Sequence, residues 1–256
     1  MITWWHTIIL GIVEGITEFL PISSTGHLIL TADILHIQQS EFLKSFEIII
    51  QLGAILAVVA LYWRSLFTSK ETIKRLIVAF IPTAIVGLLF YKTIKQYLLS
   101  DSTLVVWTLL LGGLGLIIFE HIYKEKETAT GEISKISYKQ SFIIGLFQSV
   151  ALIPGISRAA ATIIGGLLLG LKRRTIVEFS FLLAVPTMAA ASGLDLIKNA
   201  GQFSRDQFGF LALGLTISFI TALFSIKWLL RFIKNHTFTS FGIYRIAVAV
   251  IFLFLR

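Results

Sequence analysis

Six stretches of the chain are almost purely apolar, and each has about 20 residues, the length that a helix needs to cross a bilayer's hydrocarbon layer. Only 14% of the 256 residues are charged, whereas soluble domains carry about 25%. The sequence therefore predicts an all-α integral membrane protein, a single membrane domain over residues 1–256. Its six predicted transmembrane helices cover residues 45–63, 73–91, 104–123, 175–194, 208–230 and 239–255.

Two further apolar segments, 4–36 and 140–171, are too long for one span and short for two. Each contains a proline, Pro21 or Pro154, which removes a backbone donor and disfavours helix at the residue before it. We expect each segment to form a re-entrant helix–loop–helix hairpin that returns to its own side of the membrane. Non-helical backbone at that depth must be buried in protein or face water.

The two hairpin segments resemble one another. Pro21-x-x-Ser24 matches Pro154-x-x-Ser157, and Glu14 matches Gln148. A polar linker, 124–139, separates the halves, approximately 1–124 and 139–256. One hairpin and three spans in each half would invert the second half, so we expect an inverted-topology repeat whose site lies where the hairpin tips meet. The alternative is a chance similarity between segments rich in Gly, Ser and Ile.

The basic residues indicate the orientation. Fourteen Lys and Arg fall in loops on one predicted side, six fall on the other, and Arg158 and Arg245 lie within apolar segments. The side with 14 should be cytoplasmic, which puts both termini outside. The net charge of +8 thus comes mainly from Lys and Arg in the loops between spans, where they orient the protein, and no nucleic-acid partner is expected. The chain has no cysteine, which excludes disulfides and thiolate metal sites.

Glu14 and Glu18 are four residues apart, so on a helix they share one face. Two carboxylates in an apolar site repel each other, so one must take a proton or both must hold a cation. Carboxylate oxygens suit Mg²⁺ or Ca²⁺, which makes this pair the candidate metal site. The alternative is a solvated helix face, although charged residues inside membrane segments usually face the interior.

The loop Ser23-Ser24-Thr25-Gly26-His27 places hydroxyls beside an imidazole. A serine becomes a useful nucleophile only with an adjacent base, and His27 or Glu18 could serve. The hydroxyls could instead cap the returning helix. Both roles are compatible, because a helix N-terminus is itself an anion site.

Arg158 stands in the second hairpin within the motif Pro154-Gly155-Ile156-Ser157-Arg158. Its guanidinium is a planar fork of donors that fits phosphate oxygens, and Ser157 and Thr162 could add donors. The alternative is a structural ion pair with Glu47 or Glu178.

A carboxylate pair, a Ser/His loop and an Arg/Ser loop are the parts that phosphoryl chemistry needs. The spacing alone does not distinguish a phosphatase from a transporter of phosphate-bearing molecules, or from an ion-coupled carrier that uses the two glutamates.

The chain resembles the bacterial undecaprenyl pyrophosphate phosphatases, the membrane enzymes linked to bacitracin resistance, over essentially its whole length. The family's Glu/Gln-x-x-x-Glu motif corresponds to Glu14 and Glu18. Its Phe-Leu-Pro-x-Ser-Ser-Thr-Gly-His loop corresponds to residues 19–27, and its Pro-Gly-x-Ser-Arg-Ser-x-x-Thr motif to residues 154–162. This chain departs from the family by having Ala159 and Ala160 where Ser and Gly are usual.

The resemblance implies hydrolysis of undecaprenyl diphosphate to undecaprenyl phosphate and inorganic phosphate, which recycles the lipid carrier for peptidoglycan. The alternative is a transporter or flippase of phosphate-bearing polyprenyl lipids. The resemblance also implies a divalent cation, Mg²⁺ or Ca²⁺, and a place in the bacterial inner membrane with the site open to the outer, periplasmic face. The oligomeric state stays open, a homodimer being one alternative.

On this resemblance Ser24 attacks the terminal phosphorus, unless water or His27 does so. His27 takes the serine's proton or protonates the leaving lipid phosphate. Arg158 clamps the diphosphate. The remaining expected diphosphate contacts are Ser23, Thr25, Ser157 and Thr162.

Overall fold

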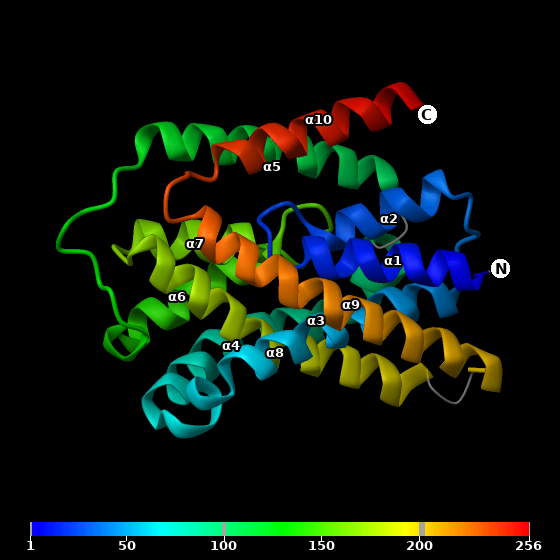
Figure 1. The fold of residues 1–256 in the computed structure, drawn as a ribbon, viewed down its shortest axis with the longest axis horizontal. Helices are drawn as coiled ribbons and strands as arrows, with labels where there is room; N and C mark the ends of the chain where they lie inside the picture. Colours follow the sequence, from blue (N-terminus) through cyan, green and yellow to red (C-terminus); the bar gives the residue numbers. More distant parts are fainter. Residues whose placement is uncertain (1, 99–100, 200–202, 256) are drawn as a thin grey trace.

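The computed structural model describes residues 2–98, 101–199 and 203–255, and the regular secondary structure within these ranges is helical, apart from one isolated bridge between Thr130 and Leu171 (Figure 1). A π-helical turn, η1 (Ile94–Leu98), follows α4, and a 3-10 turn, η2 (Ile133–Lys135), lies in the linker. The α-helices are α1 (Trp4–Thr17), α2 (Ser24–Ile34), α3 (Glu41–Thr68), α4 (Lys70–Thr93), α5 (Ser102–Ile122), α6 (Tyr138–Val150), α7 (Arg158–Leu168), α8 (Arg173–Asn199), α9 (Arg205–Phe232) and α10 (Thr239–Leu255).

The prediction of an all-α integral membrane protein is confirmed. Among the described residues, α3, α4, α5, α8 and α9 are long and apolar enough to cross a membrane. The sixth predicted span forms α10, which at 17 residues is shorter than these five. A count of six spans therefore stays a prediction.

Each proline-broken segment folds as two short helices joined by a loop. Residues 4–36 form α1, a loop and α2, and residues 140–171 lie in α6, a loop and α7. Ser23 (φ 73°) caps α2 and Ser157 (φ 79°) caps α7, each with its hydroxyl accepting from the backbone N–H three residues on. These two serines are thus equivalent in conformation and in hydrogen bonding.

This equivalence corrects the register of the internal match. The sequence pairs Ser24 with Ser157 through the prolines, but the caps pair Ser23 with Ser157, 134 positions apart. The predicted match is wrong by one residue because Pro21 lies two residues before its cap and Pro154 lies three before its own. In the corrected register Ser24 and Arg158 are equivalent, and each is the first residue of its helix.

The halves also pack in corresponding ways. Helix α1 packs against α9, and its equivalent α6 packs against α4. At Gly11 of α1 an added Cβ would press on the Gly214 carbonyl of α9, and at Gly145 of α6 it would collide with the Ala79 carbonyl of α4. Both contacts require the close backbone approach that only glycine permits. Helices α3 and α8 pack against each other, as do α5 and α10.

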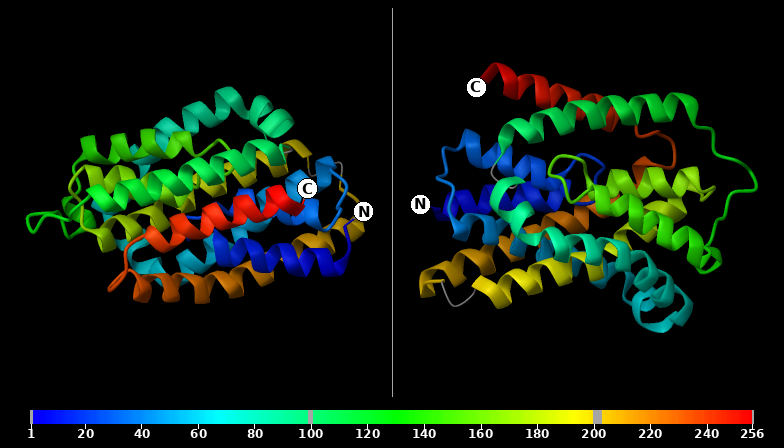
Figure 2. Two further views of the ribbon diagram at one scale, coloured as in Figure 1. Left: turned by 90° about the horizontal axis from the view of Figure 1, so that it is seen from above. Right: turned by 180° about the vertical axis from the view of Figure 1, so that it is seen from behind.

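Figure 1 shows α1 and α2 extending to one end of the molecule and α6 and α7 to the other, with their loops side by side between them. The second and third views agree on this arrangement (Figure 2). Both termini lie at the end to which α1 and α2 extend. The fold thus brings together two loops that are far apart in the sequence.

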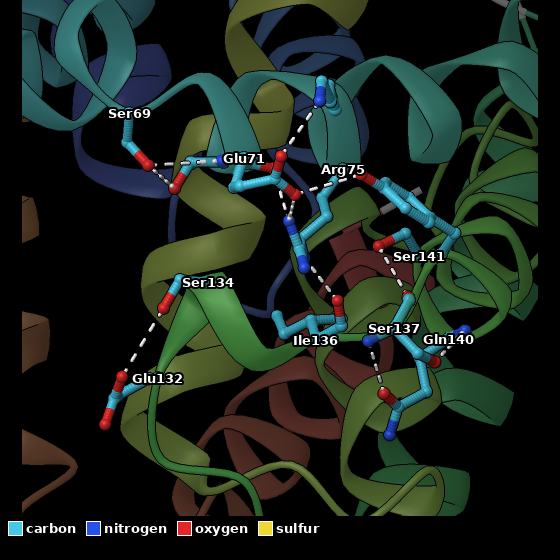
Figure 3. A network of polar contacts seen from close by, with 12 residues as sticks. Ser69, Glu71, Arg75, Glu132, Ser134, Ile136, Ser137, Gln140 and Ser141 are labelled. Atoms are coloured by element: carbon cyan, nitrogen blue, oxygen red, sulfur yellow. Dashed lines mark hydrogen bonds and ion pairs between the residues drawn. The ribbon is translucent and has the colours of Figure 1, made fainter.

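A polar network fixes the start of α6 (Figure 3). Glu71 in the first turn of α4 accepts from Arg75 (2.7 Å) and from the Tyr138 hydroxyl (3.0 Å), while Arg75 Nε donates to the Ile136 carbonyl. Ser137 then caps α6. The linker is therefore held to α4, and α6 starts from a fixed point.

Candidate active site

The two loops meet through an ion pair. Arg158, the first residue of α7, donates from Nη2 (3.1 Å) and Nε (3.3 Å) to Oε1 of Glu18, which caps the C-terminal end of α1. The side chains are only 9% and 2% exposed. Breaking a buried pair by removing one partner costs about 3–5 kcal/mol, because the other charge is left unpaired.

Ser24 donates its hydroxyl hydrogen to the other carboxylate oxygen of Glu18. It is the first residue of α2, and both side chains are buried. Glu18 therefore holds a hydroxyl on one oxygen and a guanidinium on the other. A serine beside a base that a third group holds in place is the arrangement by which a nucleophile is activated.

Arg158 is also held from the opposite side by α8. Its Nη1 donates to the Ser180 carbonyl (2.7 Å) and contacts the Ser180 hydroxyl (3.3 Å). The Ser180 hydroxyl in turn bonds with the Thr162 hydroxyl (2.7 Å), and Thr162 is fully buried. Thr162 therefore supports Arg158 through Ser180 and by donating to the Arg158 carbonyl (2.9 Å). It was expected to contact the diphosphate, but it is not among the residues that line the cavity described next.

A cavity of about 650 Å³ opens beside the ion pair. Its polar wall comes from both loops and contains Glu18, Ser23, Ser24, Thr25, Ser157 and Arg158. Its apolar wall runs along α4 and η1, through Leu88 to Ile94, and along α8 as far as Ile197. A polar end and a long apolar wall suit a ligand with a charged head and a hydrocarbon tail.

Two helix N-termini adjoin the polar wall. Ser23 and Ser157 satisfy the third N–H of α2 and α7, which leaves the first N–H groups without an intrahelical acceptor. Ser23, Ser24, Ser157 and Arg158 all line the cavity. Helix N-termini with free N–H groups attract anions, so this wall favours phosphate oxygens.

Glu14, one helical turn before Glu18, is fully buried and is not among the residues that line the cavity. By distance and angle neither of its carboxylate oxygens has a hydrogen-bond partner among the described residues, but the Glu18 carboxyl lies near enough for the two to share a proton. The other nearby charges are those of Arg158 and Glu47. An orphaned carboxylate in such a place fits either a shared proton or a cation. The described residues contain no cluster of three His, Cys, Asp or Glu side chains, so a cation here would need further oxygens from its ligand or from water.

His27 is placed away from Ser24. Its Nδ1 lies 2.7 Å from the Ser23 carbonyl, and its Nε2 lies 3.1 Å from the hydroxyl of Tyr244 in α10, whose ring stacks on the imidazole. A carbonyl can only accept, so Nδ1 carries a hydrogen and Nε2 accepts from Tyr244. Both nitrogens are used in holding the loop, and it is Glu18 that contacts the serine.

Three residues contact this region in ways that the sequence did not predict: Ser180, Gln148 and Arg245. Ser180 is an ordinary serine in a span. Gln148 lines the cavity and donates to the Thr83 (2.9 Å) and Thr187 (3.1 Å) hydroxyls, which follow helix prolines in α4 and α8. Arg245 of α10 is 1% exposed and contacts both loops. A charge within an apolar span was the available signal for Arg245, and the match to Glu14 was the signal for Gln148.

Comparison with known proteins decides the family. The family of the bacitracin resistance protein BacA matches residues 7–251. The chain is 53% identical to an undecaprenyl-diphosphatase of Aquifex aeolicus over 98% of this chain and 97% of that one. It is 52% identical to one of Sulfurihydrogenibium sp. over 98% of both chains, and 50% identical to one of Wolinella succinogenes over 98% and 97%.

The chain belongs to the BacA family. The resemblance expected from the two loop motifs is thus confirmed over nearly the full length. Against the usual pattern of the BacA family, Ala159 and Ala160 bring methyl groups to the start of α7, where both are buried. The Ala160 N–H still bonds with the Ser157 hydroxyl (3.2 Å), so the cap of this helix is intact.

Thr162→Val should destabilise the protein although the replacement has nearly the same shape. The Ser180 hydroxyl would keep its contact with Arg158 but lose its shorter bond with Thr162, and an unmet buried hydrogen bond costs about 1–3 kcal/mol. Thermal unfolding in detergent measures this. Thr216→Val is the control, because Thr216 is exposed on α9 and, within the part of the chain that the structure describes, its hydroxyl bonds to the Ala212 carbonyl of its own helix. Equal shifts in the two variants would contradict the role given to Thr162.

Proposed function

We propose that this protein hydrolyses undecaprenyl diphosphate to undecaprenyl phosphate and inorganic phosphate, and so recycles the lipid carrier used in peptidoglycan synthesis. The observation that carries the proposal is the contact of Ser24, Glu18 and Arg158, drawn from both halves, at the polar end of an otherwise apolar cavity. Its relatives named undecaprenyl-diphosphatase support the same activity. Transport or flipping of polyprenyl lipids alone would not require a serine hydroxyl bonded to a buried carboxylate.

In the first step the terminal phosphate binds at Arg158 and at the helix N-termini of α2 and α7. Phosphate oxygens compete with Glu18 for the guanidinium fork, which frees the carboxylate to take the Ser24 proton. The Ser24 oxygen bonds to the terminal phosphorus as the bond from phosphorus to the bridging oxygen breaks. Undecaprenyl phosphate leaves with that oxygen and its electron pair.

In the second step water attacks the phosphoserine. As the new oxygen–phosphorus bond forms, the bond from phosphorus to the Ser24 oxygen breaks, and that oxygen takes back the proton that Glu18 received in the first step. The hydrogens of the attacking water leave with the inorganic phosphate, and Glu18 is again a carboxylate. Direct attack by water, with Ser24 only positioning it, is the alternative route. His27 supports either route by holding the Ser23 turn, because Ser23 O and Tyr244 already occupy its ring nitrogens. Ser23, Thr25 and Ser157 contact the diphosphate, and Thr162 supports Arg158 from behind.

A divalent cation, Mg²⁺ or Ca²⁺, would be held by Glu14 and Glu18 together with substrate oxygens. The donor set fits, because Mg²⁺ is commonly bound through one or two carboxylates plus phosphates. When bound, it would neutralise part of the diphosphate charge. The orphaned oxygens of Glu14 are the feature that supports this part of the proposal.

The apolar wall of the cavity would receive the first isoprene units of the substrate. Leu88 and Ile197 extend from the cavity to the exposed surface of α4 and α8, being 65% and 86% exposed. A lipid tail could thus remain in the bilayer while its head enters the site. One chain is sufficient for the proposal, since both loops belong to it.

We further propose the finer topology: six spans, two re-entrant hairpins and an inverted repeat of halves 1–124 and 139–256. Matching caps at Ser23 and Ser157 support the repeat, as do the matching packing of α1 on α9 and of α6 on α4. The positive loops put the termini outside the inner membrane. The cavity's apolar wall runs toward the C-terminal ends of α4 and α8, which the same charge distribution would put outside, and this supports a site that opens to the outer face.

The purified protein in detergent should release inorganic phosphate from undecaprenyl diphosphate, and Arg158→Ala should lower the rate about 100-fold or more, since it removes a donor to the developing charge. Arg174→Ala is the control, because Arg174 is exposed and, among the described residues, forms its ion pair with Glu178 along α8. Ser24→Ala should abolish turnover and the trapping of a phosphoenzyme. Full activity of Ser24→Ala would eliminate the serine as nucleophile, and no release by the wild type would refute the function.

Chelation of divalent cations should reduce phosphate release to background, and Mg²⁺ or Ca²⁺ should restore it. Glu14→Gln should require about tenfold more cation for half-maximal rate, because affinity follows the charge of the ligands. Glu178→Gln, outside the site, serves as the matched control. An undiminished rate in excess chelator would mean that Glu14 and Glu18 share a proton instead of a metal.

The absence of cysteine makes the topology testable with single-cysteine variants. In intact cells a membrane-impermeant thiol reagent should label Ile2→Cys and Gln38→Cys, which flank α1 and α2. Lys139→Cys, in the first turn of α6, and Lys172→Cys, which follows α7, should react only after permeabilisation. Labelling of Ile2→Cys without Gln38→Cys would show that the first hairpin crosses the membrane.

A further inference from the structure

Arg245 is a buried cation behind both loops. Its Nη2 donates to the carbonyls of Gly155 (2.7 Å) and Thr108 (3.0 Å), and its Nη1 donates to those of Ile156 (3.1 Å) and Pro21 (3.5 Å). No carboxylate among the described residues pairs with it. Four carbonyl dipoles therefore hold a charge that is 1% exposed and lies inside an apolar helix.

Gly112 of α5 makes the space for this guanidinium. A Cβ added at Gly112 would occupy the position of the Arg245 guanidinium nitrogens. Gly115, three residues further along α5, has open space at its own Cβ position. Helices α5 and α10 thus approach each other so that Arg245 reaches the loops rather than the lipid.

The carbonyls bound by Arg245 fix the direction of the adjacent N–H groups. In a planar trans peptide the C=O and the following N–H point in opposite directions, and the described residues contain no cis peptide. Because the Ile156 carbonyl points to Arg245, the Ser157 N–H points away from it. That N–H has no acceptor among the described residues, and Ser157 lines the cavity.

We propose that Arg245 is the positioning residue of the diphosphate subsite. By turning loop carbonyls toward itself, it presents the Ser157 N–H and the start of α7 to the oxygens of a bound diphosphate. Its charge also adds positive potential behind the loops, where Arg158 is partly neutralised by Glu18. Arg245 does not touch the substrate, and its role rests on the proposed phosphatase function.

Gly112→Ala tests this without changing any charged group, because the new methyl group displaces the guanidinium. Gly115→Ala is the matched control in the same helix, with the same change in helix propensity. Gly112→Ala should raise the KM for undecaprenyl diphosphate and the inhibition constant of inorganic pyrophosphate by about tenfold each, the effect of one charge-assisted contact. The kcat should change much less, and Gly115→Ala should keep all three values.

Arg245→Lys is the second variant, since an ammonium keeps the charge but has no planar fork for four carbonyls. It should raise the same two constants. A merely structural role would instead lower kcat and the unfolding temperature while KM stays constant, and that result would overturn the proposal. So would a failure of both variants to fold while Gly115→Ala folds.

Binding of inorganic pyrophosphate can also be followed as a shift of the unfolding temperature, which requires no turnover. If the wild type released no phosphate, the proposed function would be refuted. The pyrophosphate-induced shift of the unfolding temperature could still be measured for the wild type and for Arg245→Lys. Equal shifts in the two proteins would refute the role of Arg245 alone.

Discussion

The ion pair between Glu18 and Arg158 is the interaction on which the site depends. A charge in apolar surroundings is tolerated only with a partner, and here each partner comes from a different loop. The pair therefore holds the two loops together while keeping a guanidinium and a carboxylate available at the cavity. In the proposed mechanism substrate oxygens replace the carboxylate on the guanidinium, and the freed carboxylate is neutralised by the proton that it takes from Ser24.

The surrounding packing holds this pair in place. Ser180 and Thr162 hold Arg158 from α8 and α7, and the network around Glu71 fixes the start of α6. The glycine contacts of α1 on α9 and of α6 on α4 let both hairpins pack closely on their neighbouring helices. Because these supports lie on different helices, the geometry at the cavity is a property of the whole bundle.

Much of the fold and part of the site could be predicted from the sequence. Apolar runs have the length of transmembrane spans, and a proline inside an apolar segment indicates a break in a helix. The helices and the two broken segments could therefore be predicted. Glu18, Ser24 and Arg158 could be predicted as site residues because polar groups in such apolar segments are rare. The supporting contacts of Ser180, Gln148 and Tyr244 were not, because they join different helices. Nor was the register of the repeat, which depends on the backbone of Ser23 rather than on Pro21.

The equivalence of Ser24 and Arg158 has a consequence for how such a centre arises. Each is the first residue of its helix after a matching serine cap. Two identical halves would carry two hydroxyls or two guanidiniums there, and neither set contains both an attacking group and an anion holder. The site therefore needs different residues at these two equivalent positions. Because both halves belong to one polypeptide, every molecule carries one hydroxyl and one guanidinium there.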